Sequence, residues 1–168
     1  MKWILFTGTW RVTNAQVETD VRQAVQEIVE RGDGVLTGGA TGVDFFAMDE
    51  MLRINPTFSS LRVIIPAYLE DYITDYYTNW CIEPITKKDI EHLALLLRKI
   101  KNIQPTAIIE MPYRVITQTH YDMRNDEEVL QADGVCAFQV NDSSGTQYTI
   151  DKAKQTGIPI LLHKKYTL

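Results

Sequence analysis

Short, uninterrupted apolar runs alternate along the chain with segments whose apolar residues recur at helical spacing. The first run, residues 3–7, is closed by Gly8 and followed by a helical pattern that Gly32 ends. Two further runs stand at 34–37 and 62–66, with a second helical pattern between them. Continuous apolar runs are typical of parallel strands that helices cover on both faces. The alternation therefore predicts an α/β fold, with a Rossmann-like, mostly parallel sheet and helices on both faces.

The same alternation returns near the end of the chain after one interruption. Residues 121–130 and 144–155 are predicted helices, and residues 134–138 and 158–162 are predicted strands. The interruption, residues 68–118, is rich in tyrosine and tryptophan in its first part, and we expect it to be a largely helical insertion that also carries one short strand. A chain of 168 residues has the size of one domain, so we expect a single domain over its whole length.

Local motifs predict where some of these elements begin. Thr13, followed three residues later by Gln16, fits a capping box and predicts that the first helix is capped by Thr13. Thr86 is the predicted cap of a helix in the insertion, with Asp89 in its first turn. Pro159 suggests that the last strand lies at an edge of the sheet or begins there.

The composition limits the classes of partner and cofactor. The net charge is −5, which argues against a general nucleic-acid or anionic-membrane binder because such proteins need a positive field. Cys81, Cys136 and three scattered histidines have no metal-ligand spacing, so we expect no metal and no cofactor. No signal-peptide pattern and no run of the ~18 apolar residues that a membrane span needs is present, so we expect a cytoplasmic protein.

The strongest local signal is a glycine-rich segment between a predicted strand and a predicted helix. Its backbone N–H groups are expected to point along the start of the helix, where the macrodipole favours an anion. Asp44, in the first helical turn, would repel a phosphate and suits a sugar hydroxyl or a brace for the loop. A tight turn between strand and helix explains the glycines equally well. The candidate ligand residues here are Gly38, Gly39, Ala40, Thr41, Gly42 and Asp44.

A second loop with small residues, 142–146, also lies between a predicted strand and a predicted helix. Its candidate ligand residues are Ser144, Gly145 and Thr146. Taken alone, this loop reads as an ordinary helix cap. However, the carboxyl ends of parallel strands meet at one edge of a sheet, so the two loops are expected to face one crevice.

Two further groups of residues belong to the same predicted edge. Arg124 and Asn125 suit a phosphate or a ribose, and His120, Arg124, Glu127 and Glu128 share one helix face. A solvated face with an Arg–Glu pair is the ordinary alternative.

After the first strand, Gly8, Thr9 and Arg11 are candidate ligand contacts. The neighbouring Trp10 is favoured as a core or interface aromatic over a base-stacking residue.

Taken in order, these segments resemble the SLOG superfamily, which joins the DNA-processing Smf proteins to the "lonely guy" phosphoribohydrolases. The resemblance covers nearly the whole chain except the insertion, and is closest to the small stand-alone branch. It implies a Rossmann-like sheet that binds a nucleotide or a nucleotide derivative at its loop ends. The matching segments are Thr7-Gly8-Thr9 with Arg11, the glycine-rich stretch 38–44, Arg124-Asn125, residues 132–135 and Ser144-Gly145-Thr146.

The sequence departs from the phosphoribohydrolases at an acidic position. In that family a glutamate stands three residues after the threonine of the Gly-Thr pair, whereas this chain has Thr149 there. Cleavage of a base–sugar bond needs a carboxylate near the sugar, which stabilises the developing charge or activates water. The candidate catalytic replacements are Asp44 and Glu127, with Glu128 as a further alternative.

These observations leave three functions open. The first is a nucleotide-binding sensor or ligand-sequestering module, in which the two loops hold phosphate, Arg124 neutralises it and Asp44 binds a hydroxyl. The second is a hydrolase that cleaves the N-glycosidic bond of a nucleotide. A single-stranded DNA partner is the least favoured. A homodimer formed through the insertion is the expected assembly.

Overall fold

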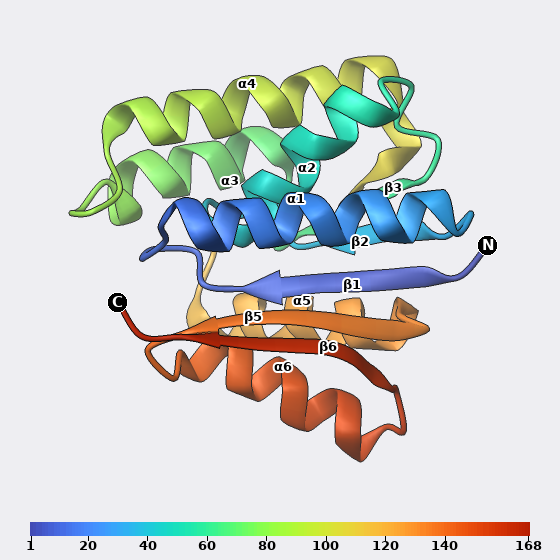
Figure 1. Cartoon of the computed structure of the whole chain (residues 1–168). Coiled ribbons are helices and arrows are strands. Elements are labelled where there is room, and N and C mark those ends of the chain that lie inside the picture. The colour runs from blue at the N-terminus through green and yellow to red at the C-terminus, as the bar shows by residue number, and fades with distance from the viewer.

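Six parallel strands form the one sheet of the computed structural model, which describes all 168 residues. The spatial order of the strands is β4-β3-β2-β1-β5-β6, which confirms the predicted Rossmann-like arrangement (Figure 1). The strands are β1 (Trp3–Gly8), β2 (Gly34–Thr37), β3 (Leu61–Ile65), β4 (Ile108–Glu110), β5 (Gly134–Val140) and β6 (Ile160–Tyr166).

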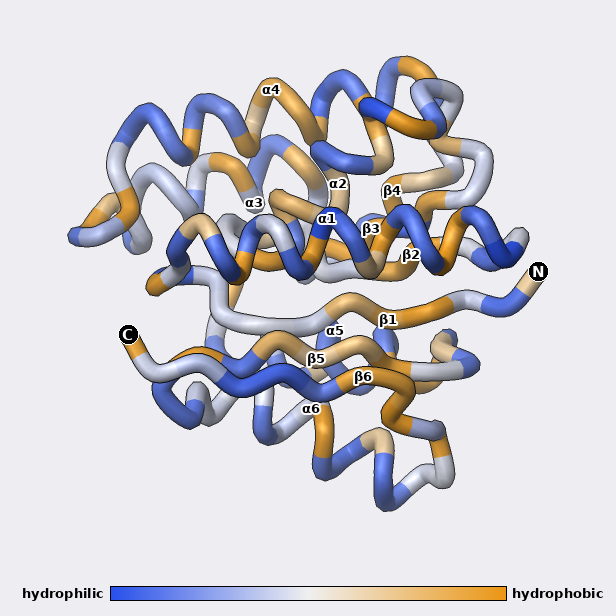
Figure 2. Tube along the Cα trace, in the orientation of Figure 1, coloured by the Kyte–Doolittle hydropathy of each residue, from blue (hydrophilic) through white to orange (hydrophobic).

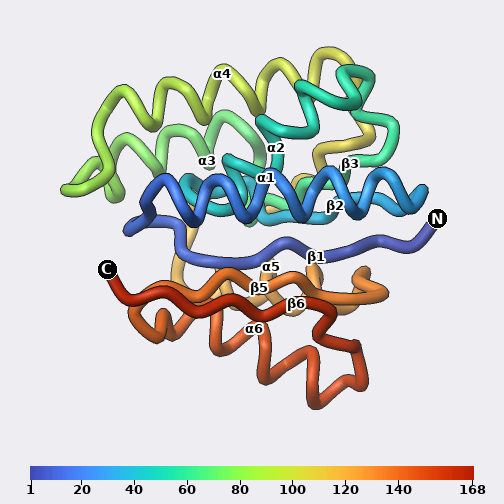
Figure 3. The backbone as a smooth tube through the Cα atoms, viewed as in Figure 1, coloured from blue at the N-terminus to red at the C-terminus, as the bar shows by residue number.

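Helices cover both faces of this sheet, as predicted (Figure 3). One face carries α1 (Ala15–Glu30), α2 (Val43–Ile54), α3 (Leu69–Asp75) and α4 (Lys87–Ile103), and the other carries α5 (Gln118–Gln131) and α6 (Ser144–Gln155). A π-helical turn, η1 (Tyr76–Trp80), and a 3-10 turn, η2 (Pro105–Ala107), complete the insertion. None of the helices has the length and apolar composition that crossing a bilayer requires.

The sheet separates two hydrophobic cores because successive residues of a strand point to opposite faces. In β1, Ile4 and Phe6 belong to a core of 34 buried residues under α1 to α4. The intervening Leu5 belongs to a core of nine residues under α5 and α6. Figure 2 shows hydrophobic residues running along β1 and alternating with polar ones along α1. The continuous apolar runs of the sequence therefore have the doubly covered surroundings that they predicted.

Two local predictions about element boundaries have different outcomes. The predicted cap of α1 by Thr13 is wrong, because Asn14 is the cap: its Oδ1 accepts a hydrogen bond from the N–H of Val17 at 3.0 Å. Thr13 stands one residue too early for its hydroxyl to reach that donor. Thr86 does cap α4, in a reciprocal pair of hydrogen bonds with Asp89. Pro159 directly precedes β6, which is an edge strand as expected.

The strand order places a crevice beside β1. From β1 the chain moves outward on one side to β2, β3 and β4, and then returns to β5 on the other side. In open α/β sheets, ligands bind at the carboxyl ends of the strands on either side of such a reversal. The loops that follow β1, β2 and β5 all reach this edge.

The two helices nearest β1 on the larger face are tied together by a buried acid. Glu50 of α2 is 1% exposed and accepts hydrogen bonds from Gln26 and Arg22 of α1, at 2.6 and 3.3 Å. Arg53 of α2 also donates to it, at 3.0 Å from its Nε. The hydrogen bonds from Arg53, and then those from Gln26 and Arg22, outweigh the effect of burial and lower the pKa of Glu50 to about 2.

We expect Glu50→Gln to lower the free energy of unfolding by about 1–3 kcal/mol at pH 7, because charge-assisted hydrogen bonds are lost. The folded-state pKa of Glu50 lies below its ordinary value of 4.5. Its contribution is therefore present above pH 4.5 and is lost as the pH falls toward 2. Urea unfolding of the parent and the variant at pH 7 and pH 3 measures both effects. The exposed Glu30→Gln is the control, and an unchanged stability of Glu50→Gln at pH 7 would contradict this role.

Candidate functional site

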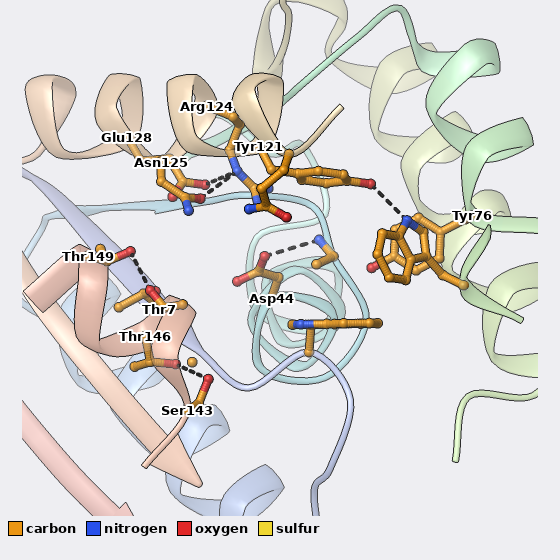
Figure 4. Close-up of a pocket in the computed structure, with 16 residues that line it drawn as sticks. Thr7, Asp44, Tyr76, Tyr121, Arg124, Asn125, Glu128, Ser143, Thr146 and Thr149 are labelled. Atoms are coloured by element: carbon orange, nitrogen blue, oxygen red, sulfur yellow. Dashed lines mark hydrogen bonds and ion pairs between the residues drawn. The ribbon is translucent and has the colours of Figure 1, made fainter. Parts of the chain in front are cut away.

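A cavity of about 150 Å³ opens at the carboxyl end of the sheet, in the crevice beside β1. The walls come from the loops after β1, β2 and β5, from α5 and from the insertion, so segments far apart in the sequence meet here (Figure 4). The lining residues are Thr7, Gly8, Trp10, Ala40, Asp44, Tyr76, Trp80, Gln118, Tyr121, Arg124, Asn125, Glu128, Ser143, Gly145, Thr146 and Thr149.

Two N–H groups of the glycine-rich segment after β2 donate hydrogen bonds within the chain. The N–H of Ala40 donates to Asp44 Oδ2 at 3.1 Å, and the N–H of Thr41 donates to the Tyr76 hydroxyl at 3.1 Å. The Thr41 hydroxyl donates to the carbonyl of Trp10 at 2.6 Å. Donors that already have partners in the protein are not free to bind a phosphate. Of this segment, only Ala40 and Asp44 line the cavity.

Packing accounts for two glycines of the same segment. Gly39 and Gly42 have φ angles of 70° and 72°, a region that disfavours other residues. A Cβ on Gly39 would lie 2.8 Å from Val63 Cγ1, and one on Gly42 would overlap the carbonyl of Thr9. These glycines are therefore explained by a tight turn between strand and helix.

The loop after β5 leaves the first backbone N–H groups of α6 without hydrogen-bond partners in the chain. The side chain of Ser143, the cap residue of α6, accepts no hydrogen bond from the backbone of the first turn. The N–H groups of Ser144, Gly145 and Thr146 have no partner within the chain. A Cβ on Gly145 would meet nothing within 4 Å, so packing does not require this glycine. An uncapped helix N-terminus with free N–H groups is a ready-made site for an anion.

A buried arginine of α5 faces the cavity, and its hydrogen bonds go to the protein itself. Arg124 is 9% exposed and donates to the carbonyl of Gly38 and, at 3.0 Å, to Asn125 Oδ1. Its Nε lies 3.4 Å from Glu128 Oε1 in an ion pair one helical turn along. Figure 4 shows the Arg124 side chain extending from α5 toward Asp44. Arg124 therefore compensates two carboxylates.

The two carboxylates have raised pKa values. Burial is the main cause at Glu128, opposed by Arg124 and reinforced by Asp44, and its pKa rises to about 8. Burial likewise raises the pKa of Asp44, against the effects of Arg124 and of the Ala40 N–H. Titratable groups whose pKa values are shifted by burial beside a cavity are typical of functional sites.

An aromatic wall closes the side of the cavity opposite α6. The ring centroids of Trp10 and Trp80 are 5.1 Å apart in an edge-to-face contact. Asp75 accepts hydrogen bonds from Trp80 Nε1 at 3.0 Å and from the Tyr121 hydroxyl at 2.9 Å, which fixes both rings. The π-helical turn η1 carries Tyr76 and Trp80 into the cavity. Trp10 thus packs against the core, as favoured, and also lines the cavity.

The cavity gathers about half of the residues that the sequence predicted. Those that line it are Gly8, Ala40, Asp44, Arg124, Asn125, Gly145 and Thr146. Those outside its lining are Thr9, Arg11, Gly38, Gly39, Thr41, Gly42, Ser144 and Glu127.

Two of the residues outside the lining have other partners. Arg11 donates to the carbonyl of Glu83 at 3.1 Å, away from the cavity. Glu127 accepts a hydrogen bond from Gln131 at 2.7 Å and lines a separate hollow beside Leu130.

Sequence reasoning missed most of the aromatic wall and Gln118. Tyr76 and Trp80 belong to the insertion, whose path over the sheet edge no periodicity predicts. Tyr121 is one turn before Arg124 on the same helix face, and this spacing was the signal that could have found it.

No protein-family model matches the sequence, and no curated protein sequence does either. Solved structures with the same fold exist at low sequence identity. DNA processing protein A from Helicobacter pylori, described with its single-stranded DNA binding mode, matches with a TM-score of 0.66 and 18% identity over 95% of this chain. DNA processing protein A from Streptococcus pneumoniae matches with a TM-score of 0.57 and 15% identity over 99% of this chain. A structural-genomics target, TM1055, matches with a TM-score of 0.54 and 14% identity over 95% of this chain.

This chain spans 63% of the Helicobacter protein, 50% of the Streptococcus protein and 72% of TM1055. The matches confirm the predicted fold, which this chain shares with the two DNA processing proteins and TM1055.

The raised pKa of Glu128 gives stability a pH dependence of definite sign. A pKa of about 8, against an ordinary 4.5, means that the folded state retains a proton that the unfolded state releases. This contribution is present below pH 4.5 and is lost as the pH rises through 8.

We expect Glu128→Gln, which has no proton to release, to reduce the loss of unfolding free energy between pH 5 and pH 8 by at least about 1 kcal/mol. Urea unfolding of the parent and the variant at both pH values gives the change in unfolding free energy between pH 5 and pH 8 for each protein. Comparing these two changes cancels any cost of the substitution that does not depend on pH. An identical pH dependence in parent and variant would contradict the assigned burial of this carboxyl.

Proposed function

We propose that the chain binds a nucleotide or a nucleotide-derived ligand at the carboxyl ends of its strands, as a sensor or ligand-sequestering module. One observation carries the proposal: the uncapped N-terminus of α6 opens into a cavity whose other walls hold buried carboxylates and aromatic rings. The helix N-terminus suits a phosphate, the carboxyl groups suit sugar hydroxyls, and the aromatic rings suit a planar base.

The proposed orientation follows from charge. A phosphate is placed at the free N–H groups of Ser144, Gly145 and Thr146, where the helix dipole favours it. The sugar is placed toward Asp44 and Glu128, whose carboxyl groups can hydrogen-bond to its hydroxyls.

The base is placed against the wall of Trp10, Trp80 and Tyr121. The enclosed 150 Å³ is smaller than the ~300–1,000 Å³ of ordinary ligand pockets, so part of such a ligand would lie at the open mouth.

A strand of nucleic acid fits the cavity less well than a single nucleotide. The Helicobacter protein of the same fold is described with a single-stranded DNA binding mode. Sites for single strands combine stacking with a positively charged groove that follows the backbone. Among the residues that line this cavity, Arg124 is the one cation, and it is buried against its own carboxylate partners.

Hydrolysis of the base–sugar bond is the second candidate function, because two carboxyls with raised pKa values line the cavity. A carboxyl that holds a proton near neutral pH could protonate a leaving base, and a second carboxylate could stabilise the positive sugar or activate water. Asp44 and Glu128 have the burial that such roles need. Glu127, the other candidate of the sequence, lines a different hollow.

Nucleotide binding predicts a stabilised fold. At a ligand concentration about 100 times the dissociation constant, the free energy of unfolding should rise by about 2.7 kcal/mol, which raises the melting temperature by about 5 °C or more. Thermal unfolding with nucleoside mono- and diphosphates, cyclic nucleotides, ADP-ribose and NAD, each matched with its nucleoside, tests this. An unchanged melting temperature across the whole panel would refute the proposal.

Gly145→Val separates binding from folding. Because a Cβ at this position meets no atom within 4 Å, the variant should keep the melting temperature of the parent without ligand. It should bind the stabilising nucleotide at least about tenfold more weakly, because the new methyl groups narrow the approach to the N–H groups of α6. Titration calorimetry measures the affinity, with the exposed Lys154→Val at the far end of α6 as the matched control. Equal affinities would place the phosphate elsewhere.

The binding proposal also predicts that no free base is released from nucleoside monophosphates above the rate without protein. Chromatography of overnight incubations detects such release. Release that Asp44→Asn abolishes would establish the hydrolase instead, since loss of an acid or base typically lowers a rate by about 10²–10⁴.

A further inference from the structure

A histidine completes the cap of the helix that forms one wall of the cavity. His120 stands in the first turn of α5, and its Nδ1 accepts a hydrogen bond at 3.1 Å from the N–H of Thr117, the residue that caps this helix. The Thr117 hydroxyl lies 3.3 Å from the same nitrogen. In the usual capping box a glutamate or a glutamine provides this acceptor. An imidazole provides it only while Nδ1 carries no proton.

Stacking holds the imidazole of His120 in this position. The centroid of its ring lies 4.2 Å from the centroid of the Tyr113 ring, with 27° between the two planes. Tyr113 is fixed in turn, because its carbonyl accepts a hydrogen bond from the N–H of Tyr68 at 3.1 Å. The segment 111–117, which leads from β4 to α5, is therefore joined to the first turn of α5 through His120.

Protonation of His120 removes the acceptor and places a charge where the helix disfavours it. An imidazolium has two N–H donors and no acceptor, so the N–H of Thr117 loses its partner. The positive end of the helix macrodipole lies at the same N-terminus and disfavours a cation. Imidazole is the side chain that ordinarily changes its charge between pH 8 and pH 5.

The neighbouring acids have other partners and do not take over the role of His120. Asp122 accepts a hydrogen bond from Gln118 at 3.0 Å. Asp75 of α3 accepts one from the Tyr121 hydroxyl at 2.9 Å. The hydrogen bonds of the imidazole are those with Thr117. The titratable or charged side chains of the segments that meet at this turn are Asp75, Tyr113, Arg114, Tyr121, Asp122 and Arg124.

The turn that His120 caps also carries residues of the cavity. Gln118 and Tyr121 line the cavity on either side of it in the sequence. We propose that His120 is a pH-sensitive switch: its protonation releases the first turn of α5 from segment 111–117, loosens the wall formed by Gln118 and Tyr121, and weakens ligand binding. The effect on ligand binding rests on the proposed function, whereas the release of the helix does not.

His120→Gln separates the switch from all other titrating groups. Glutamine keeps an acceptor at this position of a capping box and does not titrate. Because protonation costs the folded state a hydrogen bond, stability falls as the pH falls. Between pH 7.5 and pH 5 we expect the melting temperature of the parent to fall by about 2–4 °C more than that of His120→Gln. The exposed His92→Gln of α4 is the matched control and should follow the parent.

The parent alone gives a second measurement. Nuclear magnetic resonance follows the protonation of the His120 ring and the exchange of the Thr117 N–H with solvent over the same pH range. After correction for the intrinsic effect of pH on exchange, protection of this N–H should fall about fivefold, with the midpoint of the ring titration.

Ligand affinity connects the switch to the cavity. From pH 7.5 to pH 5, the affinity for the nucleotide that stabilises the fold should fall about two- to fivefold more in the parent than in His120→Gln. Titration calorimetry measures both proteins. Protonation of the phosphate itself affects both equally and cancels in the comparison.

The outcomes separate this inference from the proposed function. An equal pH dependence of the melting temperature in the parent and in His120→Gln, or constant protection of the Thr117 N–H, overturns the switch and leaves nucleotide binding intact. A switch that leaves the affinity unchanged overturns the connection to the cavity. The expected shift of melting temperature, without binding of any nucleotide, supports the switch and overturns the proposed function.

Discussion

The buried contact between the side chains of Arg124 and Glu128 is the interaction on which the cavity depends. It holds α5 against the end of β2, where Arg124 also donates to the carbonyl of Gly38. Any residue larger than glycine at position 38 would displace the pair. A buried ion pair seldom stabilises a fold better than apolar residues of the same volume would, whereas removing one partner costs about 3–5 kcal/mol. Its place beside the cavity agrees with the proposed ligand site.

The sheet was predictable because each of its strands is defined by a local pattern. Continuous apolar runs indicated buried parallel strands, and the strand order then placed the loops after β1, β2 and β5 at one edge. The local sequence pattern gave a wrong prediction where two neighbouring residues could each cap the same helix. Asn14 caps α1 although Thr13 fits a capping motif.

The same limit affected the candidate site. Adjacent helix positions differ by about 100°, so the rotation of α5 about its own axis decides which acid of a neighbouring pair faces the cavity. The structure places Glu128 in the cavity and Glu127 in another hollow, and this rotation is set by packing that the sequence does not reveal. Likewise, the path of the insertion, which brings Tyr76 and Trp80 to the sheet edge, depends on tertiary contacts. The homodimer expected through that insertion stays a prediction.

The two loops that look alike in the sequence have different surroundings in the fold. In the loop after β2, the N–H groups of Ala40 and Thr41 donate to Asp44 and Tyr76. In the loop after β5, the first N–H groups of α6, among them that of Gly145, have no partner in the chain. A ligand with phosphate at one end and hydroxyls near its middle matches this asymmetry. In the proposed orientation, the phosphate lies toward α6 and the sugar lies toward Asp44 and Glu128.

A crystal structure of the protein with the best-binding ribonucleoside monophosphate tests that orientation most directly. We expect phosphate oxygens within about 3 Å of the N–H groups of Gly145 and Thr146, and sugar hydroxyls at similar distances from the carboxyl groups of Asp44 and Glu128. A phosphate placed against the Arg124 guanidinium, or a nucleotide bound in the separate hollow beside Leu130, would contradict it.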